Sequence, residues 1–159
     1  RLRIDQLLWD VKETIEKLNQ KNKIHFDTSL LPENSMKLKV VGNEQLLLLA
    51  FTNIINNACK YSDHRVVNLS IGSSNNNVFI IVKDTGIGIP KEEIGFIYDL
   101  FYRASNTNNY EGYGIGLPLT RNIIKMHKGE LYVRSFENVG TTVQVILPIA
   151  EVANDKKNN

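Results

Sequence analysis

The 159-residue sequence has one cysteine, Cys59, which excludes an internal disulfide framework. It has no apolar run near the roughly 20 residues that a membrane-spanning helix needs, and no signal-peptide pattern. A net charge of +2 is too small to indicate a surface for nucleic acid or membrane. Because the chain starts at Arg1 without methionine, we expect a fragment of a longer protein. We expect it to be cytoplasmic, although the parent could be membrane-anchored.

Hydrophobic periodicity predicts helices over residues 2–22 and 44–61, and from the glycine-rich segment 112–117 to about residue 127. Alternating apolar residues bounded by turn residues predict strands over 23–27, 37–41, 66–72, 78–83, 129–136 and 141–147. Segment 91–102 is predicted as a short helix or two. Hairpins outnumber strict βαβ alternation, so we expect an α+β fold. It would be a two-layer sandwich, with a mixed, mostly antiparallel sheet covered on one face by about three helices.

The helix predicted over 44–61 carries a polar patch in its last two turns. Asn53, Asn57 and Lys60 share one face at i, i+4 and i+7, and Tyr61 lies beside them. Carboxamide oxygens are suitable ligands for a hard cation, and an ammonium group can hold phosphate. The alternative is a helix end that reaches solvent, and the patch alone does not separate the two.

Two glycine-rich loops follow. The first, Asp84-Thr85-Gly86-Ile87-Gly88, comes directly after an apolar strand, so the carboxylate can face a partly apolar space and accept hydrogen bonds from an amine. The second has glycines at 112, 114 and 116 where a helix begins, a place where consecutive amides bind anions. Hairpins and helix starts also use glycine, so either loop alone is weak evidence.

Five segments in this order are much more specific. They are Asn53-x-x-x-Asn57-Ala58-x-Lys60-Tyr61, Asp84-x-Gly86-x-Gly88, Leu100-Phe101-Tyr102-Arg103, Gly112-x-Gly114-x-Gly116 and Gly140-Thr141-Thr142. Together they resemble the catalytic, ATP-binding domain of bacterial sensor histidine kinases, which belong to the GHKL ATPase superfamily of gyrase, mismatch-repair and heat-shock chaperone proteins. The resemblance covers about residues 23–148.

The resemblance implies roles at the base end of an ATP site. Asp84 would bind the adenine amino group, with Gly86 and Gly88 letting the loop close over the base. Tyr61 would line or stack on the adenine. The turn that ends at Thr142 would lie near the base pocket.

At the phosphate end, the resemblance implies that Asn57 ligates magnesium and that Asn53 supports the metal site. Lys60 would contact phosphate and Arg103 would reach the terminal phosphate. Gly112, Gly114 and Gly116 would form the hinge of an ATP lid, and residues 103–113 the polar lid itself. The implied cofactors are ATP and Mg²⁺.

Position 53 separates branches of the superfamily. Members that hydrolyse ATP or phosphorylate serine carry glutamate there as a base, whereas Asn53 cannot take a proton. A histidine acceptor needs less activation than water, so the asparagine favours transfer to histidine. An ATP hydrolase or serine kinase, and a nucleotide-binding module without phosphoryl transfer, remain the alternatives.

The acceptor itself is not evident, because His25, His64 and His127 all lie outside the helical context typical of an acceptor. The resemblance therefore implies a histidine-bearing dimerisation domain of the same, homodimeric parent as partner, and indirectly a response regulator receiver domain. Residues 1–22 would be the end of the dimerisation helix and its linker, 23–149 the catalytic domain, and 150–159 a disordered polar tail. The apolar stripe of the first helix is either exposed until it binds a partner or packs back on this domain.

Overall fold

In the computed structural model, the described residues are 1–63, 65–99, 103–104 and 116–150. Five strands form a sheet in the order β2-β4-β5-β7-β6. Their bounds are β2 (Ile24–Asp27), β4 (Val67–Ser74), β5 (Asn77–Lys83), β6 (Glu130–Phe136) and β7 (Gly140–Pro148). β2 runs parallel to β4, and the other neighbours are antiparallel. The mixed, mostly antiparallel sheet confirms the predicted α+β fold.

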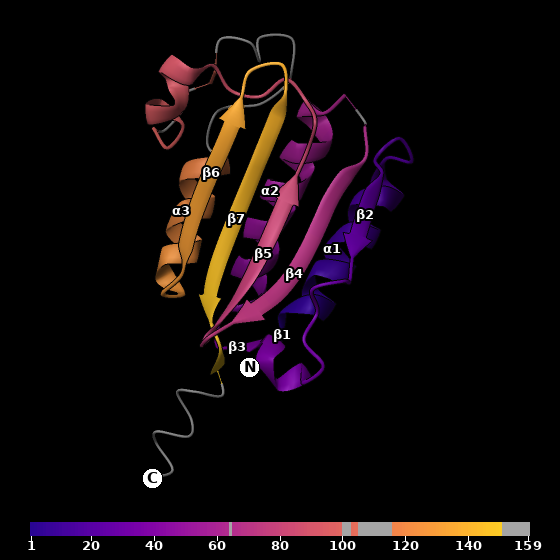
Figure 1. Cartoon of the computed structure of the whole chain (residues 1–159), viewed down its shortest axis with the longest axis vertical. Helices are drawn as coiled ribbons and strands as arrows, with labels where there is room; N and C mark the ends of the chain where they lie inside the picture. Colours follow the sequence, from indigo (N-terminus) through magenta and orange to yellow (C-terminus); the bar gives the residue numbers. More distant parts are fainter. Residues whose placement is uncertain (64, 100–102, 105–115, 151–159) are drawn as a thin grey trace.

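Three helices cover one face of this sheet: α1 (Ile4–Leu18), α2 (Glu44–Tyr61) and α3 (Gly116–Met126). Figure 1 shows them behind the strands, with no described helix in front of the opposite face. Alternate residues of the central strands, such as Leu69 of β4 and Ile80 of β5, are fully buried against the helices. The hydrophobic core is therefore the layer between helices and sheet.

The α2 helix has the bounds predicted from its periodicity. The Asn43 side chain accepts a hydrogen bond from the Leu46 N–H at 3.1 Å, which caps the first turn. Phe51 and Ile55 of α2 are fully buried and anchor it in the core. Cys59 is also buried, as expected of a small hydrophobic side chain, and burial raises the pKa of its thiol to about 11. The thiol is thus protonated and inert at neutral pH.

The α1 helix packs on this domain, which decides between the two alternatives for its apolar stripe. Ile4, Leu8 and Val11 are at most 1% exposed and belong to the same core as α2. Before α1, the short strand β1 (Leu2–Arg3) pairs with β3 (Lys39–Val40). Residues 1–22 therefore contribute to the core of the domain that follows them.

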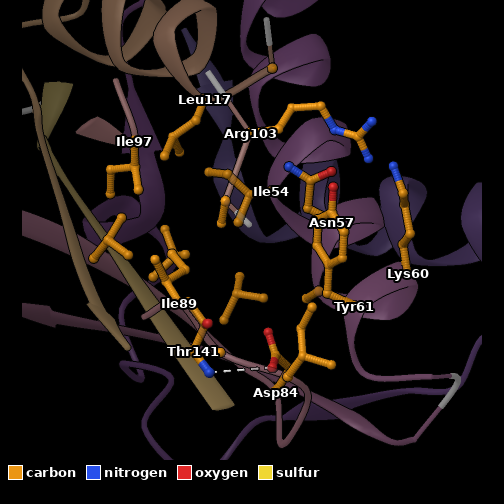
Figure 2. A pocket seen from close by; sticks show the side chains of 18 of the residues that line it. Ile54, Asn57, Lys60, Tyr61, Asp84, Ile89, Ile97, Arg103, Leu117 and Thr141 are labelled. Carbon is orange, nitrogen blue, oxygen red and sulfur yellow. Dashed lines mark hydrogen bonds between the residues drawn. The ribbon is translucent and has the colours of Figure 1, made fainter. Parts of the chain in front are cut away.

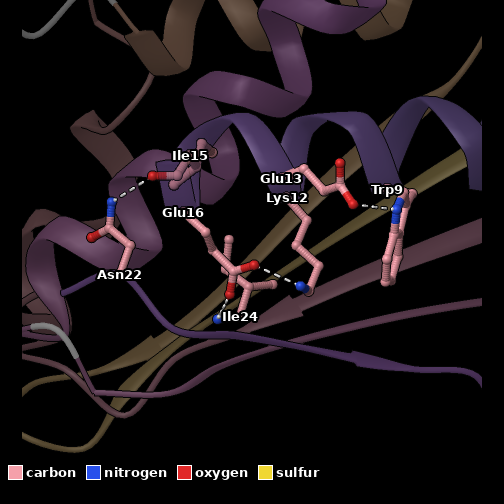
Figure 3. Close-up of polar contacts among 7 residues, drawn as sticks. All are labelled: Trp9, Lys12, Glu13, Ile15, Glu16, Asn22 and Ile24. Carbon is pink, nitrogen blue, oxygen red and sulfur yellow. Dashed lines mark hydrogen bonds and ion pairs between the residues drawn. The ribbon is translucent and has the colours of Figure 1, made fainter. Parts of the chain in front are cut away.

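Polar contacts also fix α1 to the edge of the sheet (Figure 3). The Glu16 carboxylate accepts from the Ile24 backbone N–H at 3.1 Å and from the Lys12 ammonium at 2.6 Å. The Asn22 side chain donates to the Ile15 carbonyl oxygen at 3.3 Å, beyond the end of the helix. The helix predicted over 2–22 thus ends at Leu18, and the next residues form a turn into β2.

One smaller prediction needs correction and another agrees with the structure. The strand predicted over 37–41 is reduced to β3, because the 3-10 helix η1 (Ser35–Leu38) takes up the preceding residues, capped by Asn34. After β5, the described part of segment 91–102 contains the short 3-10 helix η2 (Lys91–Phe96), in agreement with the short helix predicted there. The described helices include none with the length and apolar composition to cross a membrane.

Candidate functional site

A cavity of about 330 Å³ opens between the end of α2, the loop after β5 and the start of α3. Figure 2 shows side chains from these elements converging on it. It brings together seven of the predicted site residues, which are Asn57, Lys60, Tyr61, Asp84, Gly88, Arg103 and Gly116. Residues from four separate parts of the sequence therefore share one site.

Close backbone contacts hold the glycine-rich loop against the end of α2. The Ile87 N–H donates to the Tyr61 carbonyl oxygen at 3.1 Å, which satisfies a carbonyl in the last turn of the helix. A Cβ at position 86 would lie 2.1 Å from that same oxygen, so only glycine permits the approach. Gly86 thus does not line the cavity itself but joins two of its walls.

The same loop is also fixed to the turn between β6 and β7. Gly88 has φ of +66°, and a Cβ there would lie 2.0 Å from the Phe136 carbonyl oxygen. The Asn138 N–H donates to the Ile87 carbonyl oxygen at 2.6 Å. A non-glycine residue at 88 would be strained and would separate the loop from the turn.

Asp84 lies at the floor of the cavity and is only 7% exposed. Its Oδ1 accepts hydrogen bonds from the Gly86 N–H at 2.9 Å and the Thr141 N–H at 3.2 Å. Burial raises the pKa of the carboxyl group, and these two hydrogen bonds oppose the rise. Figure 2 shows the second carboxylate oxygen directed into the cavity, where it can accept from an amino group of a ligand.

The other end of the cavity is cationic. Figure 2 shows the Asn57 carboxamide with the Lys60 ammonium and the Arg103 guanidinium at this end. The Lys60 Nζ lies 4.9 Å from the centre of the Tyr61 ring, a cation–π contact that places the ammonium at the cavity edge. Two cations beside a carboxamide favour an anionic ligand group such as a phosphate.

Between these ends the walls are apolar. They are formed by the side chains of Ile54, Ala58, Val82, Ile87, Ile89, Ile97, Leu117, Val133 and Val143. A flat apolar ring fits such walls, with a polar edge toward Asp84. The cavity therefore suits a ligand with an amino-bearing ring at one end and an anion at the other.

Besides Gly86, two predicted residues do not line the cavity. Thr142 lies outside it, and its neighbour Thr141 lines it instead. The reason is strand alternation, because Thr141 and Val143 point to the helix-covered face of β7 and Thr142 to the opposite face. Asn53 lies one turn before Asn57 on α2 and is also outside the lining.

The remaining predicted glycines, Gly112 and Gly114, lie outside the described residues, as does the predicted lid beyond Ala104. The sequence-based prediction missed Thr141 in the lining, Ser135, whose Oγ lies 2.7 Å from the Thr141 Oγ1, and most of the apolar walls. A signal for the first two was available. The predicted turn between the last two strands places position 135 opposite 141 in a hairpin, and the structure pairs them.

The side chains at the site can also be compared with the ligands that the predicted magnesium ion needs. Within the described ranges, no cluster of three His, Cys, Asp or Glu side chains could hold a metal without other ligands. The Asn57 carboxamide oxygen is a hard ligand at the anion end of the cavity. Such a site fits Mg²⁺, which is usually held by one or two protein ligands together with substrate phosphates and water.

Comparison with known proteins agrees with this geometry. WalK of Bacillus subtilis (strain 168), a sensor histidine kinase, is 32% identical over 130 residues, which are 79% of this chain and 21% of WalK. The sensor protein VanS of Enterococcus faecium is 37% identical over 123 residues, 76% of this chain and 32% of VanS. The chain thus spans about a fifth to a third of the length of these relatives.

Solved structures share the fold. The mycobacterial sensor histidine kinase MprB superimposes with a TM-score of 0.78 at 22% identity, covering 92% of this chain and 96% of that one. Full-length ShkA in complex with AMPPNP gives a TM-score of 0.75 at 23% identity, covering 94% of this chain and 30% of that one. Residues 42–151, which contain α2 and the whole cavity lining, match the sequence pattern of an ATPase family. The chain belongs to the histidine kinase-, DNA gyrase B- and HSP90-like ATPases.

Proposed function

We propose that this chain binds Mg-ATP in the cavity and donates the γ-phosphoryl group to a histidine on a separate dimerisation domain. One observation carries the proposal: Asp84 and Asn57, which come from different elements, line the same cavity with the acid at one end and the cations at the other. ATP has the matching layout, with an amino-bearing ring at one end and a polyphosphate at the other.

Each cavity residue would contact the part of ATP that lies at its end of the cavity. Asp84 would accept a hydrogen bond from the adenine amino group, with Thr141 beside it and Tyr61 along the ring. Lys60 and Arg103 would neutralise phosphate charge, and Asn57 would hold the magnesium ion, with Asn53 and the glycines at 86, 88, 112, 114 and 116 in support. Bound Mg-ATP supplies the phosphoryl group, and the protein contributes positioning and charge neutralisation.

Transfer to histidine is favoured over hydrolysis by position 53. The side chain there is a carboxamide, which cannot act as a general base for water or a serine hydroxyl. Neither described histidine lines the cavity. His127 makes contacts of 2.7 Å from Nδ1 to the Ile123 carbonyl oxygen and 3.0 Å from Nε2 to the Asn43 N–H. His25 lies on β2, away from the cavity.

The setting of this activity is part of the proposal. The acceptor would belong to a dimerisation domain of the same homodimeric parent, and the phosphoryl group would pass from there to a receiver domain of a response regulator. Residues 1–22, which pack on this domain, would connect it to the dimerisation domain, 23–149 would form the rest of the catalytic domain and 150–159 a tail. The location would be cytoplasmic. The name of WalK, a sensor histidine kinase, and the greater length of WalK and VanS support a longer sensor-kinase parent.

The test mixes the chain with the histidine-bearing dimerisation domain of its parent and γ-labelled ATP. Label on histidine, lost when Asn57→Ala or Lys60→Ala replaces the wild type, is the expected result. Rapid release of free phosphate by the isolated chain would support an ATP hydrolase instead. Nucleotide binding without any transfer would support a binding module.

A further inference from the structure

The Ser135 hydroxyl lies behind the wall of the cavity and contacts three groups. It accepts a hydrogen bond from the Ile89 N–H at 2.8 Å and donates to the Gly140 carbonyl oxygen at 3.2 Å. Its Oγ also lies 2.7 Å from the Thr141 Oγ1. Ser135 itself does not line the cavity, whereas Ile89 and Thr141 both do.

Counting protons shows which direction of the third contact satisfies every group. A serine hydroxyl has one proton to donate and two lone pairs that accept. Either hydroxyl could donate across the 2.7 Å contact, but a carbonyl oxygen can only accept, so satisfying all three contacts requires Ser135 to donate to Gly140 and Thr141 to donate to Ser135. All three contacts are then satisfied at once, with Ser135 accepting from Ile89 and Thr141.

This direction determines what Thr141 can offer a ligand. With its proton directed to Ser135, the Thr141 Oγ1 has only lone pairs left for the cavity. Its neighbour Asp84 also presents an oxygen there, since its Oδ1 is held by the Thr141 and Gly86 N–H groups. Two adjacent acceptors favour a ligand edge with N–H donors and disfavour a carbonyl oxygen.

We propose that Ser135 is a positioning residue that makes Thr141 a hydrogen-bond acceptor, so that the base end of the cavity selects a 6-amino purine over a 6-keto purine. The proposal rests on the proposed function, because it concerns the base of the nucleotide. Ser135 acts through Thr141 and also fixes Ile89, whose side chain forms part of the apolar wall.

The experiment measures the affinities of ADP and IDP by calorimetry, since IDP has a keto oxygen in place of the amino group. We expect wild-type protein to prefer ADP. In Ser135→Ala the Thr141 hydroxyl is free to rotate and can donate to the keto oxygen, so the ADP-to-IDP affinity ratio falls by about 10-fold. Ser135→Thr retains a hydroxyl and restores the ratio, which loss of general stability would not explain.

A second pair of variants does not depend on how Ser135→Ala folds. Thr141→Val removes the acceptor and should also reduce the ratio about 10-fold, whereas Thr142→Val on the opposite face of β7 should leave it unchanged. A ratio within twofold of wild type in Thr141→Val, or in folded Ser135→Ala, overturns the inference while leaving nucleotide binding intact. Wild-type protein that binds neither nucleotide overturns the proposed function instead.

Discussion

At the scale of a single residue, the buried charge of Asp84 lowers the stability of the folded protein. Its carboxyl group is buried, and burial raises its pKa above the ordinary value, although two N–H groups compensate in part. An acid with a raised pKa in the folded state stabilises the fold only while it is protonated. This contribution is complete below the unfolded-state pKa and is lost as the pH rises through the folded-state pKa. Above its folded-state pKa, the buried carboxylate therefore costs stability.

We expect Asp84→Asn to stabilise the nucleotide-free protein at pH 7 while weakening ATP binding. The asparagine oxygen can still accept from Gly86 and Thr141, and the buried charge is removed. The gain should be roughly 1 kcal/mol, or about 2–4 °C in Tm for a domain of this size. Thermal unfolding at several pH values checks it, and the difference from wild type should shrink as the pH falls through the folded-state pKa of Asp84. A variant less stable than wild type at pH 7 would contradict this view of Asp84.

Individual residues also show how far the sequence predicts the site. Asp84, Asn57 and Lys60 could be proposed from the sequence because each belongs to a motif, and the order of the motifs along the chain is recognisable without a structure. Thr141 was missed in favour of Thr142, because a motif does not say which face of a strand a residue occupies. Which face Thr141 and Thr142 occupy depends on the register of β7 with β5 and β6, and this pairing forms only in the folded sheet.

At the scale of elements, the loop from Asp84 to Pro90 is held by contacts that only small residues permit. Gly88→Ala should destabilise the domain by at least about 2 kcal/mol, because alanine is strained at φ +66° and its Cβ would overlap the Phe136 carbonyl oxygen. Gly95→Ala is the matched control, since nothing lies within 4 Å of a Cβ there. Denaturant unfolding compares the two, and equal stabilities would show that the loop is not held in this way.

The α1 helix is the element for which sequence reasoning left two outcomes open. An amphipathic stripe has the same pattern whether it packs on its own domain or on a partner, so periodicity alone could not decide. By contrast, α2 was predicted with its observed bounds, because its long apolar run is capped by Asn43 and followed by polar residues.

Stability measurements can confirm that α1 belongs to the core. Leu8→Ala should cost about 3 kcal/mol, because Leu8 is fully buried and its loss leaves a cavity. Leu18→Ala on the same helix should change stability by less than about 0.5 kcal/mol, since Leu18 is 82% exposed. Urea unfolding of both variants is the measurement. A small effect at Leu8 would mean that α1 is dispensable to the fold.

At the scale of the whole molecule, the fold collects its functional groups at one end of the helix–sheet sandwich. The last turns of α2, the loop after β5, the β6–β7 turn and the start of α3 all meet there (Figure 1). The sequence predicted the fold class, since hairpins and amphipathic helices are local patterns. It did not predict the apolar walls of the cavity, because residues such as Ile97 and Val133 resemble any other core residue until the chain folds.

The central claim is that one cavity holds the base at Asp84 and the metal-bound phosphates at Asn57. Calorimetric titration with ATP, with and without Mg²⁺, tests it most directly in wild type, Asp84→Ala and Asn57→Ala. We predict that Asp84→Ala loses at least about 10-fold in affinity in both conditions. Asn57→Ala should lose mainly the part of the affinity that Mg²⁺ adds. Wild-type affinity in both variants would contradict the account.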